Sequence, residues 1–192
     1  MACLGQDGTA HALFSGKSLP RTGTMRHPVP PRKVPNAARR SREYLTPREV
    51  DALLAAARRL GRHGHRDATM MLLASRHGRR VSELVALCWE QVDLQGGVLH
   101  VHRRKNGLAT THPLYGLQIR ALRALPRAYP DTPYVFVSER RGPLADATVR
   151  KLVARAGEAA HLGFPVHPHL LRHATGCKLA NDRHDTRVIQ HY

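Results

Sequence analysis

Residues 167–173 read His-Pro-His-Leu-Leu-Arg-His, and the rest of the chain is organised around this stretch. Pro168 suits the first turn of a helix, so we expect a helix to begin here. His169, Arg172 and His173 then share one helical face, because residues three and four apart are neighbours on a helix. That face presents one permanent cation and two groups that titrate near neutrality, beside the N–H groups of a helix N-terminus. The arrangement suits an anionic group such as a phosphate.

Two other interpretations of the stretch stay open. One is an ordinary surface helix whose His and Arg side chains bind nothing. The other is a zinc site formed by His167, His169 and His173. Against zinc, no paired Cys or Glu stands at ligand spacing, and Arg172 would repel a dication. We therefore expect neither a metal nor any other cofactor.

The composition points to a nucleic-acid partner. The 192 residues suffice for one domain and a tail, and a hydrophobic content of 42% can support a core. There are 31 Lys and Arg residues against 14 Asp and Glu, which gives a net charge of +17. Such a balance favours a polyanion held through its phosphates. Only 5% of the residues are aromatic, which argues against a platform on which the bases of a single strand would stack.

Cysteine usage and hydropathy predict a cytoplasmic protein. Cys3, Cys88 and Cys177 are few and far apart, which fits free thiols in a reducing compartment. No apolar run reaches membrane-spanning length, and residues 1–20 lack the apolar stretch of a signal peptide.

Residues 1–40 are predicted to form a flexible basic arm ahead of a domain over residues 41–192. The arm contains many Gly and Pro residues, with seven Lys or Arg against one Asp. It could follow a DNA backbone. A solvated tail without a role and a wrongly assigned start are the alternatives.

Local patterns predict an α+β fold that is mostly helical. Thr46, Pro47 and Glu49 form a helix start with a capping box, and Leu45 and Val50 are placed for a hydrophobic staple. Asn-Gly at residues 106–107 is a hairpin signal between two strands, and it puts Lys105 at the tip. Hydrophobic periodicity and breakers such as Gly78 predict helices over residues 46–60, 67–76, 81–90, 116–129, 146–161 (capped by Asp146), 169–181 and from 185, and strands over residues 98–103, 108–112 and 134–137.

Three segments together resemble the tyrosine recombinases, or phage integrase family. Arg76–Leu84 resembles the family's first arginine box, with the catalytic position at Arg80. Residues 104–114 resemble its lysine hairpin, and His169–His173 resembles its His-x-x-Arg box. The similarity covers about residues 42–192 and is greatest to the small fimbrial-switch (type 1 fimbriae regulatory) invertases. It implies the recombinase catalytic domain with a small β-hairpin sheet, acting on DNA near the nucleoid, with tetramers on DNA in the family.

The resemblance also implies a chemistry without metal or nucleotide. A tyrosine hydroxyl attacks a DNA phosphodiester and gives a 3′-phosphotyrosine and a free 5′-hydroxyl, which keeps the bond energy for rejoining. Arg80 and Arg172 would stabilise the phosphorane, because each guanidinium can bind two oxygens. Lys105 would protonate the leaving 5′-oxygen. His169 would bind a non-bridging oxygen or assist proton transfer.

Two supporting residues complete the expected site. Glu83 lies one helical turn after Arg80 and could hold its guanidinium, or it could be an ordinary solvated carboxylate. His173 lies beside Arg172 on the predicted face.

The sequence departs from the family at its C-terminal end. Residues 190–192 resemble those just before the family's Leu-Gly-His box, and that box and the nucleophilic tyrosine beyond it are not in the sequence. Tyr192 stands only 20 residues after Arg172, and the other four tyrosines, at positions 44, 115, 129 and 134, precede the His-Arg box. We therefore expect a C-terminally truncated recombinase with impaired cleavage. The alternatives are a non-cleaving DNA-binding remnant or regulator, and a non-functional fragment that folds poorly.

Overall fold

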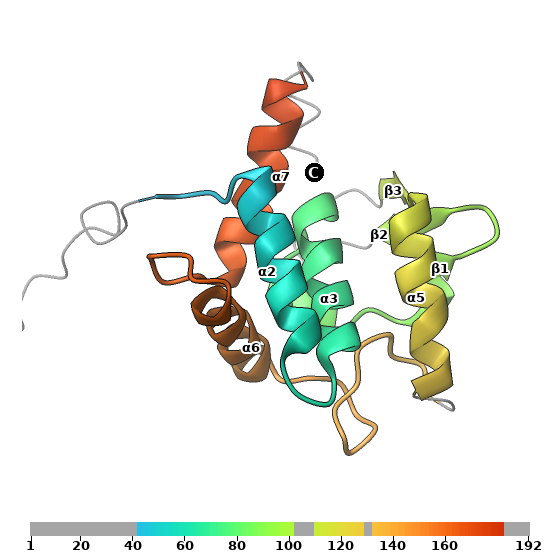
Figure 1. The fold of residues 1–192 in the computed structure, drawn as a ribbon. Coiled ribbons are helices and arrows are strands. Elements are labelled where there is room, and N and C mark those ends of the chain that lie inside the picture. Colours follow the sequence, from blue (N-terminus) through green and yellow to red (C-terminus); the bar gives the residue numbers. More distant parts are fainter. Residues whose placement is uncertain (1–41, 102–109, 129–131, 183–192) are drawn as a thin grey trace, which may run out of the picture. The chain divides into compact units, whose positions relative to one another are not determined.

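The computed structural model describes residues 42–101, 110–128 and 132–182. They lie within one compact unit, residues 36–192, while a second unit, residues 1–35, lies outside the described residues. The predicted arm, the hairpin tip with Lys105 and the last predicted helix with Tyr192 also fall outside them. The described elements are α2 (Pro47–Arg59), α3 (Gly64–His77), α4 (Val81–Val85), the 3-10 helix η1 (Trp89–Gln91), β1 (Val92–Asp93), β2 (Val98–Val101), β3 (Thr110–Pro113), α5 (Gly116–Ala128), α6 (Asp146–Ala159) and α7 (Pro168–Asn181) (Figure 1). The predicted α+β class, mostly helical with a small sheet, is confirmed.

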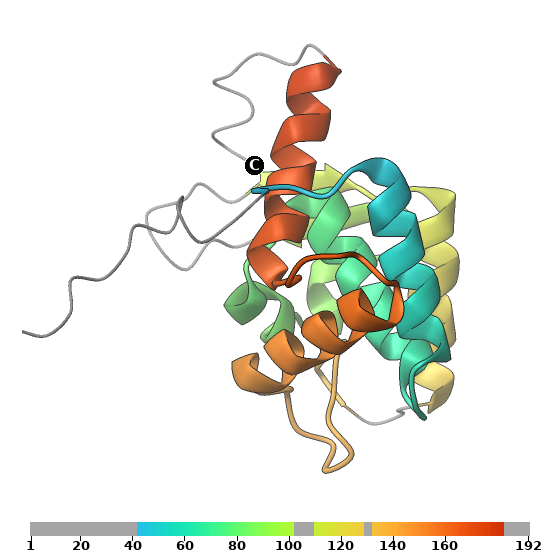
Figure 2. The same ribbon diagram turned by 60° about the vertical axis from the view of Figure 1, so that its left-hand side comes forward.

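Helix α3 is the central element of this unit. It contacts α2, α5 and α7, and α6 packs on α2 (Figures 1 and 2). Twelve of its fourteen residues are buried, including the run Met70–Leu73. Only His65 and Arg76 of this helix are exposed, so the neighbouring elements surround it. Its ends therefore fix where the segments before and after it lie.

A three-stranded antiparallel sheet, in the order β1-β2-β3, lies between η1 and α5 in the chain. Leu99 of β2 pairs with Val92 of β1 and with His112 of β3. Burial alternates along β2, with Leu99 and Val101 inside, as the period of two in a half-buried strand requires. Strands β2 and β3 are the two arms of the predicted hairpin.

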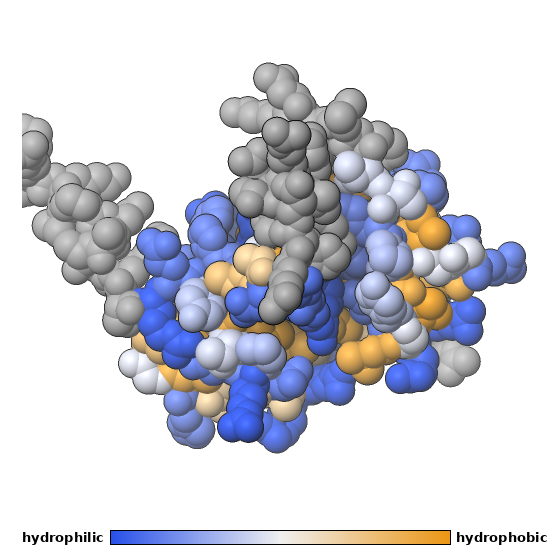
Figure 3. All heavy atoms as spheres, turned by 90° about the horizontal axis from the view of Figure 1, so that it is seen from above, coloured by the Kyte–Doolittle hydropathy of each residue, from blue (hydrophilic) through white to orange (hydrophobic). Residues whose placement is uncertain are grey.

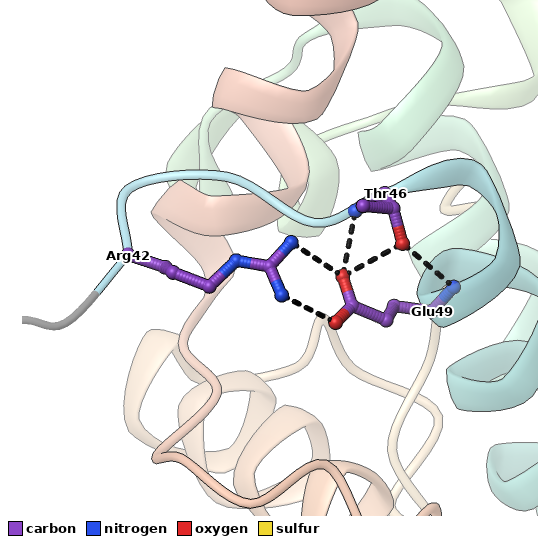
Figure 4. Close-up of polar contacts among 3 residues, drawn as sticks. All are labelled: Arg42, Thr46 and Glu49. Atoms are coloured by element: carbon purple, nitrogen blue, oxygen red, sulfur yellow. Dashed lines mark hydrogen bonds and ion pairs between the residues drawn. The ribbon is translucent and has the colours of Figure 1, made fainter.

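The N-terminus of α2 has the predicted capping box (Figure 4). The Thr46 hydroxyl accepts a bond from the Glu49 N–H (3.4 Å), and the Glu49 carboxylate accepts one from the Thr46 N–H (2.8 Å). Arg42 adds two bonds to the same carboxylate, at 2.7 and 3.0 Å. Arg42 also lies 5.5 Å from the Phe164 ring centroid, which links this helix start to the loop before α7.

We expect Glu49→Gln to lower the free energy of unfolding by about 1 kcal/mol at pH 7. Burial raises the pKa of the Glu49 carboxyl, but the hydrogen bonds from Thr46 and the Arg42 guanidinium outweigh it and leave the pKa lowered. The carboxylate therefore stabilises the fold above its ordinary pKa of 4.5, and this contribution is lost as the pH falls through the folded value. Urea unfolding at pH 7 and pH 4 measures both effects.

Asp51→Asn is the matched control, because Asp51 is an exposed acid on the same helix. It should leave the free energy of unfolding unchanged at both pH values. An equal loss in both variants, or a Glu49→Gln loss that does not shrink with falling pH, would contradict the account.

Two predicted elements are wrong. The third helix ends at Val85 and not at residue 90, because the chain after it pairs with a distant segment: Val135 N–H bonds to the Leu87 carbonyl (2.9 Å) and Trp89 N–H to the Pro133 carbonyl (2.8 Å). A helix that continued to residue 90 would bury Val81, Val85 and Cys88 on one face, but these residues are only half-buried and Leu87 is buried. Residues 134–137 form isolated bridges to Cys88 and Pro143 and not a regular strand.

Smaller differences concern element ends. Helix α3 begins at Gly64, three residues before the predicted start, and has no side-chain cap. Asp146 is the first residue of α6 and not its cap, and α6 ends at Ala159. Strand β1 was not predicted, since two residues give no periodic signal.

Seen from the end where α7 projects, most of the visible described surface is hydrophilic, with smaller hydrophobic patches between (Figure 3). None of the helices in the described ranges is both long and apolar enough to span a bilayer.

Candidate functional site

The segment after α3 positions the first arginine. Helix α3 ends at His77 and is capped by Gly78, whose φ of +58° lies in the left-handed region that glycine adopts without strain. The chain then turns through Arg79, and Arg80 becomes the N-cap of the short helix α4. The predicted break at Gly78 thus directs Arg80 away from the buried helix.

Glu83 holds Arg80 at two points. Its carboxylate accepts a bond from the Arg80 backbone N–H (3.0 Å) and another from the guanidinium Nη1 (3.0 Å). The Glu83 side chain is only 6% exposed, whereas that of Arg80 is 48% exposed. A buried carboxylate therefore orients a cation that remains accessible to an anionic ligand.

Helix α7 positions the second arginine. Pro168 is its first residue, and its buried face, Leu170, Leu171, Ala174 and Thr175, packs against the core. The Thr175 hydroxyl donates to the Ser75 carbonyl of α3 at 2.7 Å. This bond and the buried face fix the rotation of α7 about its axis.

The two arginine boxes meet at Gly78. The Arg172 guanidinium Nη1 donates to the Gly78 carbonyl, a contact between residues 94 positions apart in the sequence. Arg80 follows Gly78 by two residues. The structure therefore brings Arg172 to the segment that carries Arg80, and both cations lie in the region where α3 ends and α7 begins.

The other expected site residues are only partly described. His169 and His173 are exposed on α7, on the side away from its buried face, and the His167 and His169 rings are 6.0 Å apart. Lys105 and Tyr192 lie outside the described residues. Within the described ranges, no three or more His, Cys, Asp or Glu side chains are grouped so as to hold a metal ion.

A buried polar cluster that the sequence does not predict lies beside this site. His77, Arg79, His112 and Gln118 are each no more than 3% exposed. His77 and His112 come from segments that resemble the family boxes, but nothing in the sequence distinguishes a buried histidine in a turn or strand from a surface one.

Comparisons with known proteins identify the family of the chain. The sequence model of the phage integrase family matches residues 43–192. The type 1 fimbriae regulatory protein FimB of Escherichia coli K12 is 37% identical over 161 residues, which cover 81% of this chain and 80% of FimB.

Solved structures of similar fold include two recombinases. The crystal structure of XerA recombinase aligns with a TM-score of 0.68 and 28% identity, over 77% of this chain and 53% of XerA. A lambda integrase (75–356) dimer bound to a COC′ core site aligns with a TM-score of 0.62 and 25% identity, over 81% of this chain and 60% of that one. The chain thus spans between half and two thirds of the length of these two solved chains.

Proposed function

The chain belongs to the phage integrase family, and from this premise we propose that it acts in site-specific DNA recombination, breaking and rejoining strands through a 3′-phosphotyrosine. Its partner is double-stranded DNA, on which recombination requires more than one copy of the chain. The lambda integrase dimer bound to its core site supports such an assembly by analogy.

The observation that carries the proposal is the contact between Arg172 and Gly78. Recombination by this chemistry needs two guanidiniums at one phosphate, because negative charge accumulates on the non-bridging oxygens as the phosphorane forms. Arg172 approaches the turn from which Arg80 projects, which supports the proposal that both cations bind one anion. A guanidinium has five N–H donors in a fixed plane, and one bond to a carbonyl orients that plane.

The remaining roles in the proposal follow the chemistry of the transfer. Glu83 keeps the Arg80 guanidinium in place before DNA binds, which lowers the cost of ordering it at the transition state. His169 and His173, exposed near the start of α7, contact non-bridging oxygens. Lys105, at the hairpin tip predicted from sequence, protonates the leaving 5′-oxygen.

Two points of the sequence analysis stay predictions. The first is that residues 1–192 by themselves are impaired in cleavage, because none of their tyrosines follows the His-Arg box at the distance of the family's nucleophile. The second is the alternative of a DNA-binding remnant or regulator that occupies sites without cutting. A covalent-adduct assay on the chain extended with a relative's C-terminal segment separates the two, since only a recombinase that has its tyrosine yields a protein–DNA band that survives detergent.

DNA binding should be strongly salt-dependent. With a net charge of +17, the chain should bind through Lys and Arg contacts to phosphates, and the logarithm of the affinity should fall linearly with the logarithm of the salt concentration. Fluorescence anisotropy with a labelled duplex between roughly 50 and 200 mM salt measures the slope. An affinity that stays constant over this range would contradict binding through phosphates.

Deleting residues 1–40 tests whether this segment contributes to affinity for all duplexes or to recognition of a particular DNA sequence. These residues carry seven Lys or Arg, and long basic side chains contact phosphates without reading base edges. The deletion should weaken binding to all duplexes alike and make the salt slope shallower. A selective loss for one sequence would instead assign base readout to the arm.

A further inference from the structure

Two buried histidines meet beside the arginine turn. His77 is the last residue of α3 and His112 lies on β3, and they are 3% and 2% exposed. Their ring centroids are 5.5 Å apart at an interplanar angle of 47°. Gln118 of α5, 2% exposed, joins them: its Nε2 lies 3.0 Å from His77 Nε2. The end of α3 thus shares one polar cluster with β3 and α5, two consecutive elements that follow it more than 30 positions later in the sequence.

The hydrogen bonds determine which nitrogen of His77 carries the proton. Gln118 Oε1 accepts a bond from the Tyr115 backbone N–H at 2.7 Å, and a backbone N–H can only donate. The amide nitrogen of Gln118 therefore faces His77 and donates to its Nε2. His77 Nε2 must then be an acceptor, so the neutral ring carries its proton on Nδ1.

The electrostatic environment favours the same neutral state. Burial lowers the pKa of His77, and the neighbouring charges of His112, Arg79 and Arg76 lower it further, to about 3. A protonated ring would direct an Nε2–H at the amide donor of Gln118. His77 is therefore a constant acceptor across the neutral pH range.

The cluster connects the two halves of the proposed site. Gly78, whose carbonyl binds Arg172, follows His77 directly, and Arg80 comes two residues later. On the other side, His112 pairs with Leu99 in the β2–β3 ladder, and its Nε2 lies 3.2 Å from the Thr110 hydroxyl. A shift at His77 would thus move the arginine turn relative to β3.

A buried polar cluster lowers the stability of the fold unless its hydrogen bonds compensate for the lost solvation. Burying polar side chains costs free energy that hydrogen bonds only partly recover, and an apolar residue at position 77 would pack without that cost. Buried polar contacts are directional, however, and they specify one arrangement of the elements that they join.

We propose that His77, His112 and Gln118 form a positioning joint that fixes strand β3, and with it the β2–β3 pair, against the turn that carries Gly78 and Arg80. The inference rests on the proposed function, because the turn and the hairpin matter together only if both face one DNA phosphate. The three residues are positioning and not catalytic residues, since their buried side chains touch no substrate.

Two substitutions of His77, with side chains of equal length, distinguish the effect of its hydrogen bond to Gln118 from the effect of the space that its ring fills. His77→Gln places an acceptor oxygen near the position of Nε2, whereas His77→Met fills similar space with only a weak acceptor. Ser75→Ala is the matched control: Ser75 is buried on the same helix, and its hydroxyl bonds within that helix, to the Leu72 carbonyl (2.9 Å).

Amide hydrogen exchange on the full 192-residue chain provides the main test. In His77→Met, exchange at Gln118–Ile119 of α5, where the lost bond is made, and at Thr110–His112 of the preceding strand should rise about tenfold, while exchange at Val149–Val153 of α6 stays unchanged. His77→Gln should restore slow exchange, and Ser75→Ala should leave β3 as in the wild type. A uniform rise over all elements, or equal exchange in the Met and Gln variants, would overturn the joint.

DNA binding by the same proteins tests the link to function. If the joint aligns the side chains that bind phosphates, His77→Met should make the salt slope shallower by about 0.9 for each phosphate that the variant no longer neutralises, and His77→Gln should keep the wild-type slope. Equal slopes in all variants would overturn the functional role of the joint. A wild-type chain that does not bind DNA would instead refute the proposed function, and the exchange data would still decide whether the joint exists.

Discussion

Replacing Arg172 with alanine should slow DNA cleavage by about 100- to 1,000-fold, because the phosphorane loses one of its two guanidinium donors. The measurement is single-turnover cleavage by the chain extended at its C-terminus with the C-terminal segment of FimB. The substrate is a duplex selected from a random pool by binding. DNA affinity should change little, since many other Lys and Arg residues contact phosphates. Arg80→Ala should have an effect of the same size.

Two control variants distinguish the requirement for a guanidinium at position 172 from a general requirement for positive charge. Arg172→Lys keeps a cation but removes the planar donor that contacts Gly78, so the rate should remain far below that of the wild type. Arg150→Ala removes an exposed arginine from α6 and should leave the rate unchanged. Normal cleavage by Arg172→Ala would remove Arg172 from the site.

A second large effect is expected in the covalent-adduct assay. None of the five tyrosines in the sequence should act as the nucleophile, because four precede the His-Arg box and Tyr192 follows Arg172 by only 20 residues. Charge stabilisation without a correctly placed attacking hydroxyl gives no covalent intermediate, and a misplacement of about 1 Å can already cost on the order of 100-fold. The 192-residue chain should therefore form no detergent-stable band on a suicide substrate.

The extended chain should form that band on the same substrate. A band from the 192-residue chain that disappears in Tyr192→Phe would contradict the prediction and make Tyr192 the nucleophile. No band from either protein, combined with normal DNA binding, would favour the DNA-binding remnant or regulator.

Local signals predicted most of the fold correctly. The capping box at Thr46 and Glu49, the helix stop at Gly78 and the Asn-Gly hairpin each depend on residues close together in the chain, and the structure has the first two and both arms of the third. The start of α7 at Pro168 follows from the same kind of rule. Motif order then placed Arg80 and Arg172 in elements that meet at Gly78.

Long-range pairing explains what the sequence could not predict. Leu87 and Trp89 have apolar neighbours at helical spacing, but bonds to residues 133–135, more than 40 positions later, end the helix at Val85. Arg66 likewise looks like a surface residue in sequence. In the fold it is 6% exposed, paired with Asp67 at 2.7 Å and bonded to the Val137 carbonyl at 2.6 Å. The His77 cluster belongs to the same class, since the partners of His77, His112 and Gln118, lie more than 30 positions later in the sequence.

The central claim is that Arg80 and Arg172 act on one phosphate, and substrate charge tests it most directly. A methylphosphonate at a single position replaces one charged phosphate oxygen with a neutral methyl group, so that phosphate needs less cationic stabilisation. The measurement is the cleavage rate of the extended chain and its Arg80→Ala and Arg172→Ala variants on duplexes that carry the methylphosphonate at the cleaved position or at neighbouring positions. We predict that the factor by which each alanine variant cleaves more slowly than the extended wild-type chain shrinks markedly when the methylphosphonate replaces the cleaved phosphate. At the neighbouring positions the factor should not change, and the sensitive phosphate should be the same one for both variants. Penalties that stay the same at every position, or that shrink at different phosphates for the two arginines, would contradict the account.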